Sequence, residues 1–255
     1  MPLLATLSLF GCKSVTSRDA QATTALFSAA DGVPVTATIY KKSDSATWIV
    51  LCHQAGYSRG EYNEIAPKLV ALGFNCIAID ARSGDQVNGV PNQTAQAAHD
   101  AKKPTEYLDA KQDIEAAVNY AYGLGKRKVI LFGSSYSASL ALLLGTTSRA
   151  IEAIVAFSPG EYFGDHLNLT RSIQSLSIPT FVTSARKEAG GVTALFHGQA
   201  ASSVTQFVPN KEGVHGASAL WSSTPNNDEY WTALKSFLKP YERPGMLKRL
   251  TAKLS

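Results

Sequence analysis

The chain has 255 residues, of which 45% are hydrophobic and 17% charged, so it can bury a full core and fits one domain better than two. The formal net charge of +4 is small, and much of the excess lies near the C-terminus, where residues 243–255 form a basic tail read as a solvated or surface-packed helix. The body of the chain has no basic stretch interleaved with aromatic residues, which argues against nucleic acid as a partner, while composition leaves the oligomeric state open.

The first 21 residues are interpreted as a leader. A short apolar run ends in Gly11-Cys12 and is followed by a polar stretch. The run is too short to span a bilayer. It resembles the end of a bacterial lipoprotein signal peptide, which would make Cys12 the lipidated residue and anchor the protein in the cell envelope. Phe10 and the lack of a preceding Lys or Arg depart from that pattern, so a plain leader on a cytoplasmic protein is the alternative.

The predicted domain, residues 22–242, opens with a hairpin. Alternating segments at 24–30 and 34–40 flank Asp31-Gly32, a pair typical of a tight turn. An apolar strand at 47–52 and an amphipathic helix at 62–72, closed by Gly73, come next. The chain therefore begins antiparallel.

From there strands and helices alternate. Uninterrupted apolar strands are expected at 75–79, 129–132, 151–157, 179–183 and 204–208, with helices at 107–121, after 137, at 192–198 and at 230–238. Such strands indicate an α/β protein with a mostly parallel sheet of eight strands, counting the N-terminal hairpin, and helices on both faces.

Three further features complete this outline. Residues 83–104 lack clear periodicity and are read as a pocket wall or as a solvated connector. The interval 157–178 is too short for a large lid. Cys52 and Cys76 fall in strands as small buried hydrophobes, with a disulfide between them as the alternative, and no Cys/His spacing suggests a metal site.

A nucleophile elbow is the most informative motif. The strand at 129–132 runs through Gly133-Ser-Ser-Tyr-Ser137 directly into an apolar helix. Such a sharp turn exposes one side chain and needs small residues two positions before and after it, which Gly133 and Ser137 provide around Ser135. Ser135 is therefore the predicted nucleophile, and the N–H of Tyr136 at the helix start is a predicted oxyanion donor.

A serine nucleophile needs a base, usually a histidine held by a carboxylate, and on this architecture both follow the serine in the chain. Of the downstream histidines, His215 lies in a loop directly after the last strand, between Gly213 and Gly216. His166 lies in the preceding excursion and His197 on a helix. His215 is the predicted base.

Glu188 is the predicted acid, because no other carboxylate lies between Asp165 and Glu212; a surface glutamate paired with Arg186 or Lys187 is the alternative. The second oxyanion donor is expected in the loop after Cys52, at Ala55, with Gln54 as the alternative. His53 is expected to order that loop, and Asp80 and Arg82 are read as structural.

Four motifs carry a resemblance to the α/β-hydrolase superfamily over residues 24–241: His53-Gln-Ala-Gly56, Asp80-Ala-Arg-Ser-Gly84, Gly133-Ser-Ser-Tyr-Ser137 and Gly213-Val-His-Gly216. Among branches the chain resembles small serine esterases shaped like dienelactone hydrolases, which carry cysteine where this chain has Ser135. Gln54 and Ser137 replace glycines, and Glu188 replaces an aspartate.

The resemblance implies a serine hydrolase that cleaves a small-molecule carboxylic ester through an acyl-enzyme and needs no metal or organic cofactor. An amidase, peptidase or acyltransferase using the same residues is one alternative. A non-catalytic binding protein of this fold is another.

Overall fold

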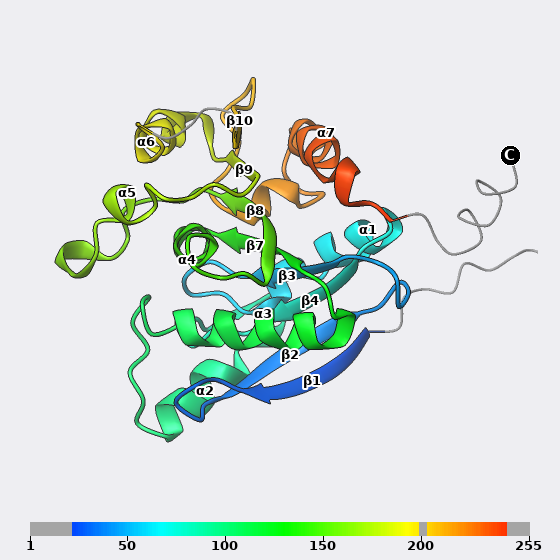
Figure 1. The fold of residues 1–255 in the computed structure, drawn as a ribbon, viewed down its shortest axis with the longest axis vertical. Coiled ribbons are helices and arrows are strands. Elements are labelled where there is room, and N and C mark those ends of the chain that lie inside the picture. Colours follow the sequence, from blue (N-terminus) through cyan, green and yellow to red (C-terminus); the bar gives the residue numbers. More distant parts are fainter. Residues whose placement is uncertain (1–21, 199–202, 244–255) are drawn as a thin grey trace, which may run out of the picture.

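The structure is a computed structural model that describes residues 22–198 and 203–243. Cys12, the leader and most of the basic tail lie outside these ranges. An eight-stranded sheet has the order β1-β2-β4-β3-β7-β8-β9-β10 (Figure 1). Its strands are β1 (Ala22–Ser28), β2 (Pro34–Tyr40), β3 (Trp48–Cys52), β4 (Asn75–Ile79), β7 (Val129–Ser134), β8 (Ile151–Phe157), β9 (Thr180–Thr183) and β10 (Val204–Phe207).

The sheet is parallel from β4 to β10 and antiparallel at its N-terminal edge. β1 pairs with β2 from Ala22 opposite Tyr40 to Ser28 opposite Pro34, and β2 continues antiparallel to β4. The turn between β1 and β2 includes Gly32, whose φ is +88°. The predicted sheet and N-terminal hairpin are thus confirmed.

Helices cover both faces of the sheet. They are α1 (Ile65–Ala71), α2 (Gln93–Asp100), α3 (Lys111–Gly125), α4 (Tyr136–Gly145), α5 (Leu169–Ser172), α6 (Ala189–Leu195) and α7 (Asn227–Leu238). Figure 1 shows α3 and α4 on one face of the sheet and α1 and α7 on the other. Alternate residues of β3 point to opposite faces, so Val50 belongs to the core with α3 and α4, and Leu51 to the core with α1 and α7. A run of apolar residues is therefore required on each central strand.

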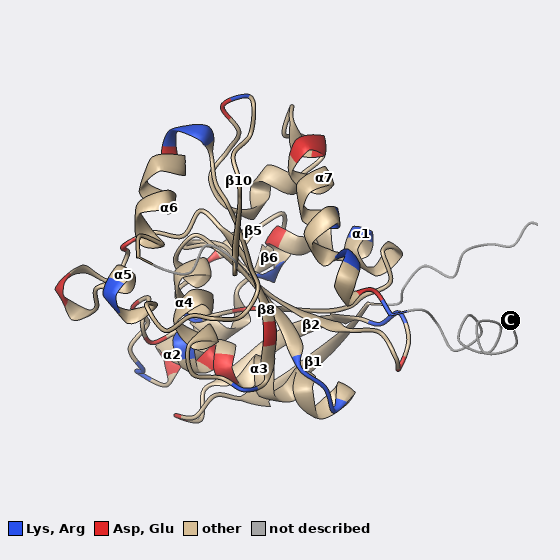
Figure 2. Cartoon of the chain, turned by 45° about the horizontal axis from the view of Figure 1, so that its top comes forward, with Lys and Arg blue, Asp and Glu red and all other residues tan. Residues whose placement is uncertain are grey.

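Charged residues of both signs are interspersed on the helices and loops facing the viewer in Figure 2. The first turn of α7 carries Asp228 and Glu229, whose negative charges interact favourably with the positive end of the helix dipole.

Two local predictions need correction. Residues 83–104, expected to lack regular structure, contain a small hairpin of β5 (Gln86–Val87) and β6 (Val90–Pro91), followed by α2. Its turn is Asn88-Gly89, both at positive φ, and the Asn92 side chain caps α2 by accepting the Ala95 N–H at 2.8 Å.

The helix expected at 107–121 begins four residues later, at Lys111. Glu106 and Asp109 close a turn before it, because the Asp109 carboxylate accepts the Glu106 N–H at 2.9 Å. The helix ends where Lys126 adopts a left-handed conformation with φ of 51°.

Cys52 and Cys76 are buried free thiols, as expected of strand cysteines, and form no disulfide with each other. Between β8 and β9 the chain forms only the 3-10 turn η2 (Gly164–His166) and the one-turn helix α5. The expectation of no large lid is therefore confirmed.

Buried ion pairs hold the N-terminal edge to α3. Arg82 is 1% exposed and bonds Asp113 of α3 at 2.7 Å and Asp31 of the first hairpin turn at 2.7 Å. The Arg82 guanidinium holds the pKa of Asp31 at about 2. Asp80 accepts the backbone N–H groups of Arg59 and Gln93, each at 2.8 Å, so Asp80 and Arg82 have the structural roles predicted for them.

Candidate active site

Ser135 occupies the sharp turn between β7 and α4. Its backbone φ and ψ are 59° and −123°, a conformation that a non-glycine residue adopts only under strain. Gly133 has no room for a side chain, since a Cβ there would collide with the Ser137 carbonyl and the backbone of Ala138. These are the features expected of a nucleophile elbow.

Ser137, which stands where a glycine is common, is accommodated by hydrogen bonds. Its hydroxyl lies 2.8 Å from the Cys52 carbonyl and 2.9 Å from the Ser134 carbonyl, and it accepts the Ser134 N–H at 2.9 Å. The side chain thereby ties the start of α4 to the ends of β3 and β7. The departure from glycine leaves the elbow geometry intact.

His215 lies beside Ser135, on the loop that follows β10. Its Nε2 is 2.8 Å from the Ser135 Oγ, and its Nδ1 is 2.8 Å from the Glu188 Oε1. The next residue, Gly216, has φ of +72°, and a Cβ on it would collide with the Gln54 amide oxygen and crowd the Ser134 hydroxyl. Glycine at 216 is therefore required for this loop to approach β3 and β7.

Glu188 is at the end of the 3-10 turn η3 (Arg186–Glu188), directly after β9. Burial opposes its ionisation, but hydrogen bonds from His215 and Ser158 outweigh this and hold the pKa of Glu188 below its ordinary value. The ionised carboxylate only accepts, so Nδ1 of His215 carries the proton and Nε2 is left to accept the Ser135 hydroxyl proton.

Ser158 is a member of the site that the sequence reading missed. It follows β8 at φ of 53°, donates its hydroxyl to Glu188 Oε2 at 2.7 Å, and accepts the Gly216 N–H at 3.0 Å. It therefore links the acid to the loop carrying His215. The only sequence signal was its position at the carboxyl end of a buried strand.

Of the two residues predicted as oxyanion donors, Tyr136 begins α4 directly after Ser135, and Ala55 lies in the loop after β3, which pairs with β7. In the described residues the backbone N–H groups of Ala55 and Tyr136 have no hydrogen-bond acceptor. The alternative donor, the Gln54 N–H, is bonded to Glu61 Oε2 at 2.8 Å. It is not free for a ligand.

His53 has the structural role predicted for it. It is fully buried, its Nδ1 lies 2.8 Å from the Gln54 carbonyl, and its Nε2 accepts the Ala81 N–H at 2.9 Å. Burial lowers the pKa of His53, so the ring is neutral and orders the loop after β3.

An aromatic cavity of about 320 Å³ is lined by two tyrosines that contact the elbow, although Ser135 and Tyr136 are not among its described lining residues. Tyr107 lines it and stacks on Tyr136 with ring centroids 4.7 Å apart. Tyr162 also lines it, donates to the Ser158 carbonyl at 2.9 Å, and has its pKa raised by burial while its contact with the Ser135 hydroxyl opposes that rise. The other lining residues are Glu106, Leu108, Asp109, Phe163 and His166.

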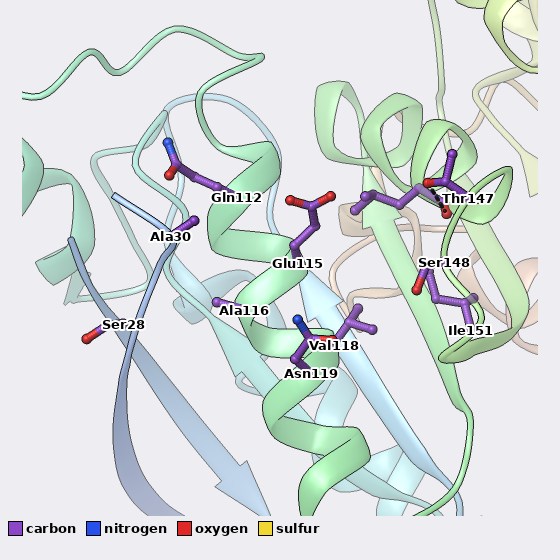
Figure 3. Close-up of a pocket in the computed structure, with 11 residues that line it drawn as sticks. Ser28, Ala30, Gln112, Glu115, Ala116, Val118, Asn119, Thr147, Ser148 and Ile151 are labelled. Carbon is purple, nitrogen blue, oxygen red and sulfur yellow. Dashed lines mark hydrogen bonds between the residues drawn. The ribbon is translucent and has the colours of Figure 1, made fainter. Parts of the chain in front are cut away.

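A second cavity, of about 440 Å³, lies between the end of β1, α3 and the end of α4. Figure 3 shows Gln112, Glu115 and Asn119 along α3 on one side of it, with Thr147 and Ser148 on the other. Its described lining residues include neither Ser135, His215 nor Glu188.

The described parts of the chain contain no helix long and apolar enough to cross a membrane. Across the same ranges, no three His, Cys, Asp or Glu side chains are grouped so that they could hold a metal ion.

The sheet order, the flanking helices and the serine turn after the central strand β7 define the α/β-hydrolase fold. The structure is similar to an esterase of Pyrococcus furiosus, with 17% identity, a TM-score of 0.68, and coverage of 88% of this chain and 93% of that one. It is also similar to a dienelactone hydrolase from Anabaena variabilis, with 14% identity, a TM-score of 0.66, and coverage of 89% and 100%.

An acylaminoacyl peptidase of Pyrococcus horikoshii gives a TM-score of 0.65 at 14% identity, over 88% of this chain and 42% of that one. No protein-family model matches the sequence, and no curated protein matches it. At these identities the likeness establishes the fold, and the activity must be argued from the site.

Proposed function

We propose that the protein is a serine hydrolase that cleaves carboxylic esters through an acyl-enzyme. The observation that carries this proposal is the continuous hydrogen-bonded chain from Glu188 through His215 to Ser135, with Ser135 on a strained turn. Serine is a weak nucleophile until a base removes its proton, and this arrangement supplies the base and fixes its tautomer.

In the proposed reaction, Ser135 Oγ attacks the ester carbonyl carbon while its proton passes to His215 Nε2. Charge develops on the carbonyl oxygen, and the N–H groups of Ala55 and Tyr136 stabilise it. The C–O bond to the alcohol then breaks, and the alcohol leaves with the proton from Nε2.

Deacylation repeats these steps with water. Water attacks the acyl-enzyme and gives a proton to His215 Nε2, and that proton returns to Ser135 Oγ as the carboxylic acid leaves. Glu188 stays ionised throughout and stabilises the imidazolium that forms in each half-reaction.

The cavity lined by Tyr107, Tyr162 and Phe163 is the proposed site of the acyl or alcohol group. Its volume suits a small ester, since many ligand pockets lie between about 300 and 1,000 Å³. The names of the similar structures, an esterase and a dienelactone hydrolase, support ester chemistry. One similar structure is a peptidase, so amides are the substrates to compare with esters.

A fluorophosphonate probe tests the proposal, because it labels only serines activated in this way. We expect labelling of the native protein, loss of labelling in Ser135→Ala and after heat denaturation, and full labelling of Ser148→Ala, which removes a serine just beyond the other end of α4. Labelling that persists in Ser135→Ala would contradict the assignment.

A matched pair of p-nitrophenyl acetate and p-nitroacetanilide then separates esterase from amidase activity. We expect turnover of the ester at least about 100-fold faster in kcat/KM than that of the anilide. Folded wild-type protein that neither reacts with the probe nor hydrolyses either compound would favour the non-catalytic binding protein.

A further inference from the structure

Glu61 is a carboxylate sealed inside the protein. It lies in the 3-10 turn η1 (Arg59–Tyr62), and its residue is 0% exposed. Its Oε2 accepts the Gln54 N–H at 2.8 Å, and its Oε1 accepts the Ser134 hydroxyl at 2.8 Å. The Ser134 Oγ in turn accepts the Ala217 N–H at 2.8 Å.

Each partner is next to a group of the proposed reaction. Gln54 precedes the oxyanion donor Ala55, and Ser134 precedes the nucleophile. Ala217 lies two residues after the base His215. One buried carboxylate therefore joins the three segments that must keep fixed positions relative to one another.

The charge state of Glu61 is finely balanced. Burial raises its pKa to about 7, while the hydrogen bonds from Gln54 and Ser134 and the charge of His215 lower it. The other titratable groups facing it are the Cys52 thiol of β3 and the phenols of Tyr62 and Tyr136, and burial raises the pKa of each, keeping it neutral.

His215 itself faces two carboxylates, Glu188 in direct contact and Glu61 through its charge. A negative charge on Glu61 favours the imidazolium that forms when Ser135 is deprotonated.

Protonation of Glu61 would reverse one hydrogen bond of the network. Only the ionised carboxylate has both oxygens free to accept, Oε2 from the Gln54 N–H and Oε1 from the Ser134 O–H. Once protonated, Glu61 Oε1 would donate to Ser134, whose own proton would have to turn away. An alternative acceptor is in place, since the buried Gln54 Oε1 has no partner among the described residues and packs, like the Ser134 hydroxyl, against Gly216.

We propose that Glu61 is a positioning residue of the esterase site: its ionised form locks the loop of Ala55, the elbow of Ser135 and the loop of His215 into the reactive arrangement. This assignment rests on the proposed function. It gives the enzyme a group outside Ser135, His215 and Glu188 that must lose a proton before turnover.

The test compares Glu61→Gln with wild type and with Glu64→Gln, a matched control that removes a half-buried carboxylate three residues away, bonded to the Ser222 N–H and Lys68. Hydrolysis of p-nitrophenyl acetate is measured from pH 5 to 9. We expect Glu61→Gln to lower kcat about 10- to 100-fold with KM changed less than about 3-fold, because orientation is lost rather than binding. Glu64→Gln should behave as wild type.

The pH profile distinguishes positioning from general structural support. Below neutral pH, log kcat/KM of the wild type should fall with a slope one unit steeper than that of Glu61→Gln, because only the wild type has a Glu61 carboxylate to protonate. Ser134→Ala keeps the carboxylate but removes a hydrogen bond to its charged form, so its acid limb should move to higher pH. This second variant decides the question if Glu61→Gln does not fold.

The outcomes distinguish a failure of the proposed function from a failure of the role assigned to Glu61. A wild type without Ser135-dependent labelling overturns the proposed function and this assignment together. A labelled, active wild type overturns the assignment of Glu61 alone if folded Glu61→Gln keeps the kcat and the steeper acid limb of the wild type, or if Ser134→Ala keeps the wild-type profile.

Discussion

Replacing Glu61 with glutamine should make the protein's stability less dependent on pH. The folded protein holds the Glu61 proton more tightly than the unfolded chain, because burial raises the pKa of the side chain from 4.5 to about 7. By linkage, the free energy of unfolding contributed by this group is largest below pH 4.5 and is lost as the pH rises to about 7. Above pH 7 the contribution stays constant.

The size of the effect follows from that rise in pKa. Each unit corresponds to about 1.4 kcal/mol, so ionising Glu61 in the folded protein costs about 3 kcal/mol relative to ionising it in the unfolded chain. Against a total stability of about 5–15 kcal/mol, this is a large fraction. Glutamine fills the same volume and carries no charge, so the cost is absent from Glu61→Gln.

Urea unfolding of both proteins at pH 5, 6, 7 and 8, followed by tryptophan fluorescence, measures the difference. Trp48 and Trp231 are buried and report on both sides of the sheet. Groups such as Asp31 titrate in both proteins, so their contributions cancel in the difference between the two unfolding free energies. The unfolding free energy of the wild type minus that of Glu61→Gln should fall by about 2.5 kcal/mol from pH 5 to 8, since part of the total effect lies below pH 5. A difference that is constant or rises with pH would refute the reasoning.

Three further substitutions test other parts of the structure. Gly133→Ala forces a Cβ against the Ser137 carbonyl and should lower the free energy of unfolding by about 1–3 kcal/mol in urea titrations, with loss of probe labelling. Glu188→Gln removes the charge that fixes the His215 tautomer, and kcat should fall about 10⁴-fold in stopped assays at pH 8, with no loss of fold by circular dichroism. Arg82→Met leaves the Asp113 carboxylate buried without its cation, and thermal and urea unfolding should show a loss of about 3–5 kcal/mol.

The elbow and its partners could be predicted from the sequence because each depends on local signals. Small residues around Ser135 mark the turn, and the glycines beside His215 mark a loop with unusual backbone angles. Glu188 was found by elimination, as the one carboxylate in its interval. The order of strands then brings the three segments to the same sheet edge, where the hydrogen bonds among them form.

Glu61 and Ser158 could not be predicted in the same way. A glutamate in a polar loop is normally solvated, and nothing near Glu61 in the sequence indicates burial. Its burial arises from contact with Ser134, 73 residues later in the chain. The hairpin at Asn88-Gly89, by contrast, was a readable signal, since this dipeptide is typical of two-residue hairpin turns.

Two strained serines and a buried carboxylate lie close to the elbow of this protein. Ser135 and Ser158 both have positive φ, and the buried Glu61 carboxylate lies one residue from the elbow through its bond to Ser134. Arg82 and Asp113 are as buried as Glu61, but the guanidinium of Arg82 is paired with the carboxylates of Asp113 and Asp31, whereas Glu61 has only neutral donors in contact with it. Both the strained backbone and the unpaired charge lower stability, so packing alone does not explain why they lie together near Ser135. Such features are expected at a functional site, where a fixed reactive geometry is kept at a cost in stability.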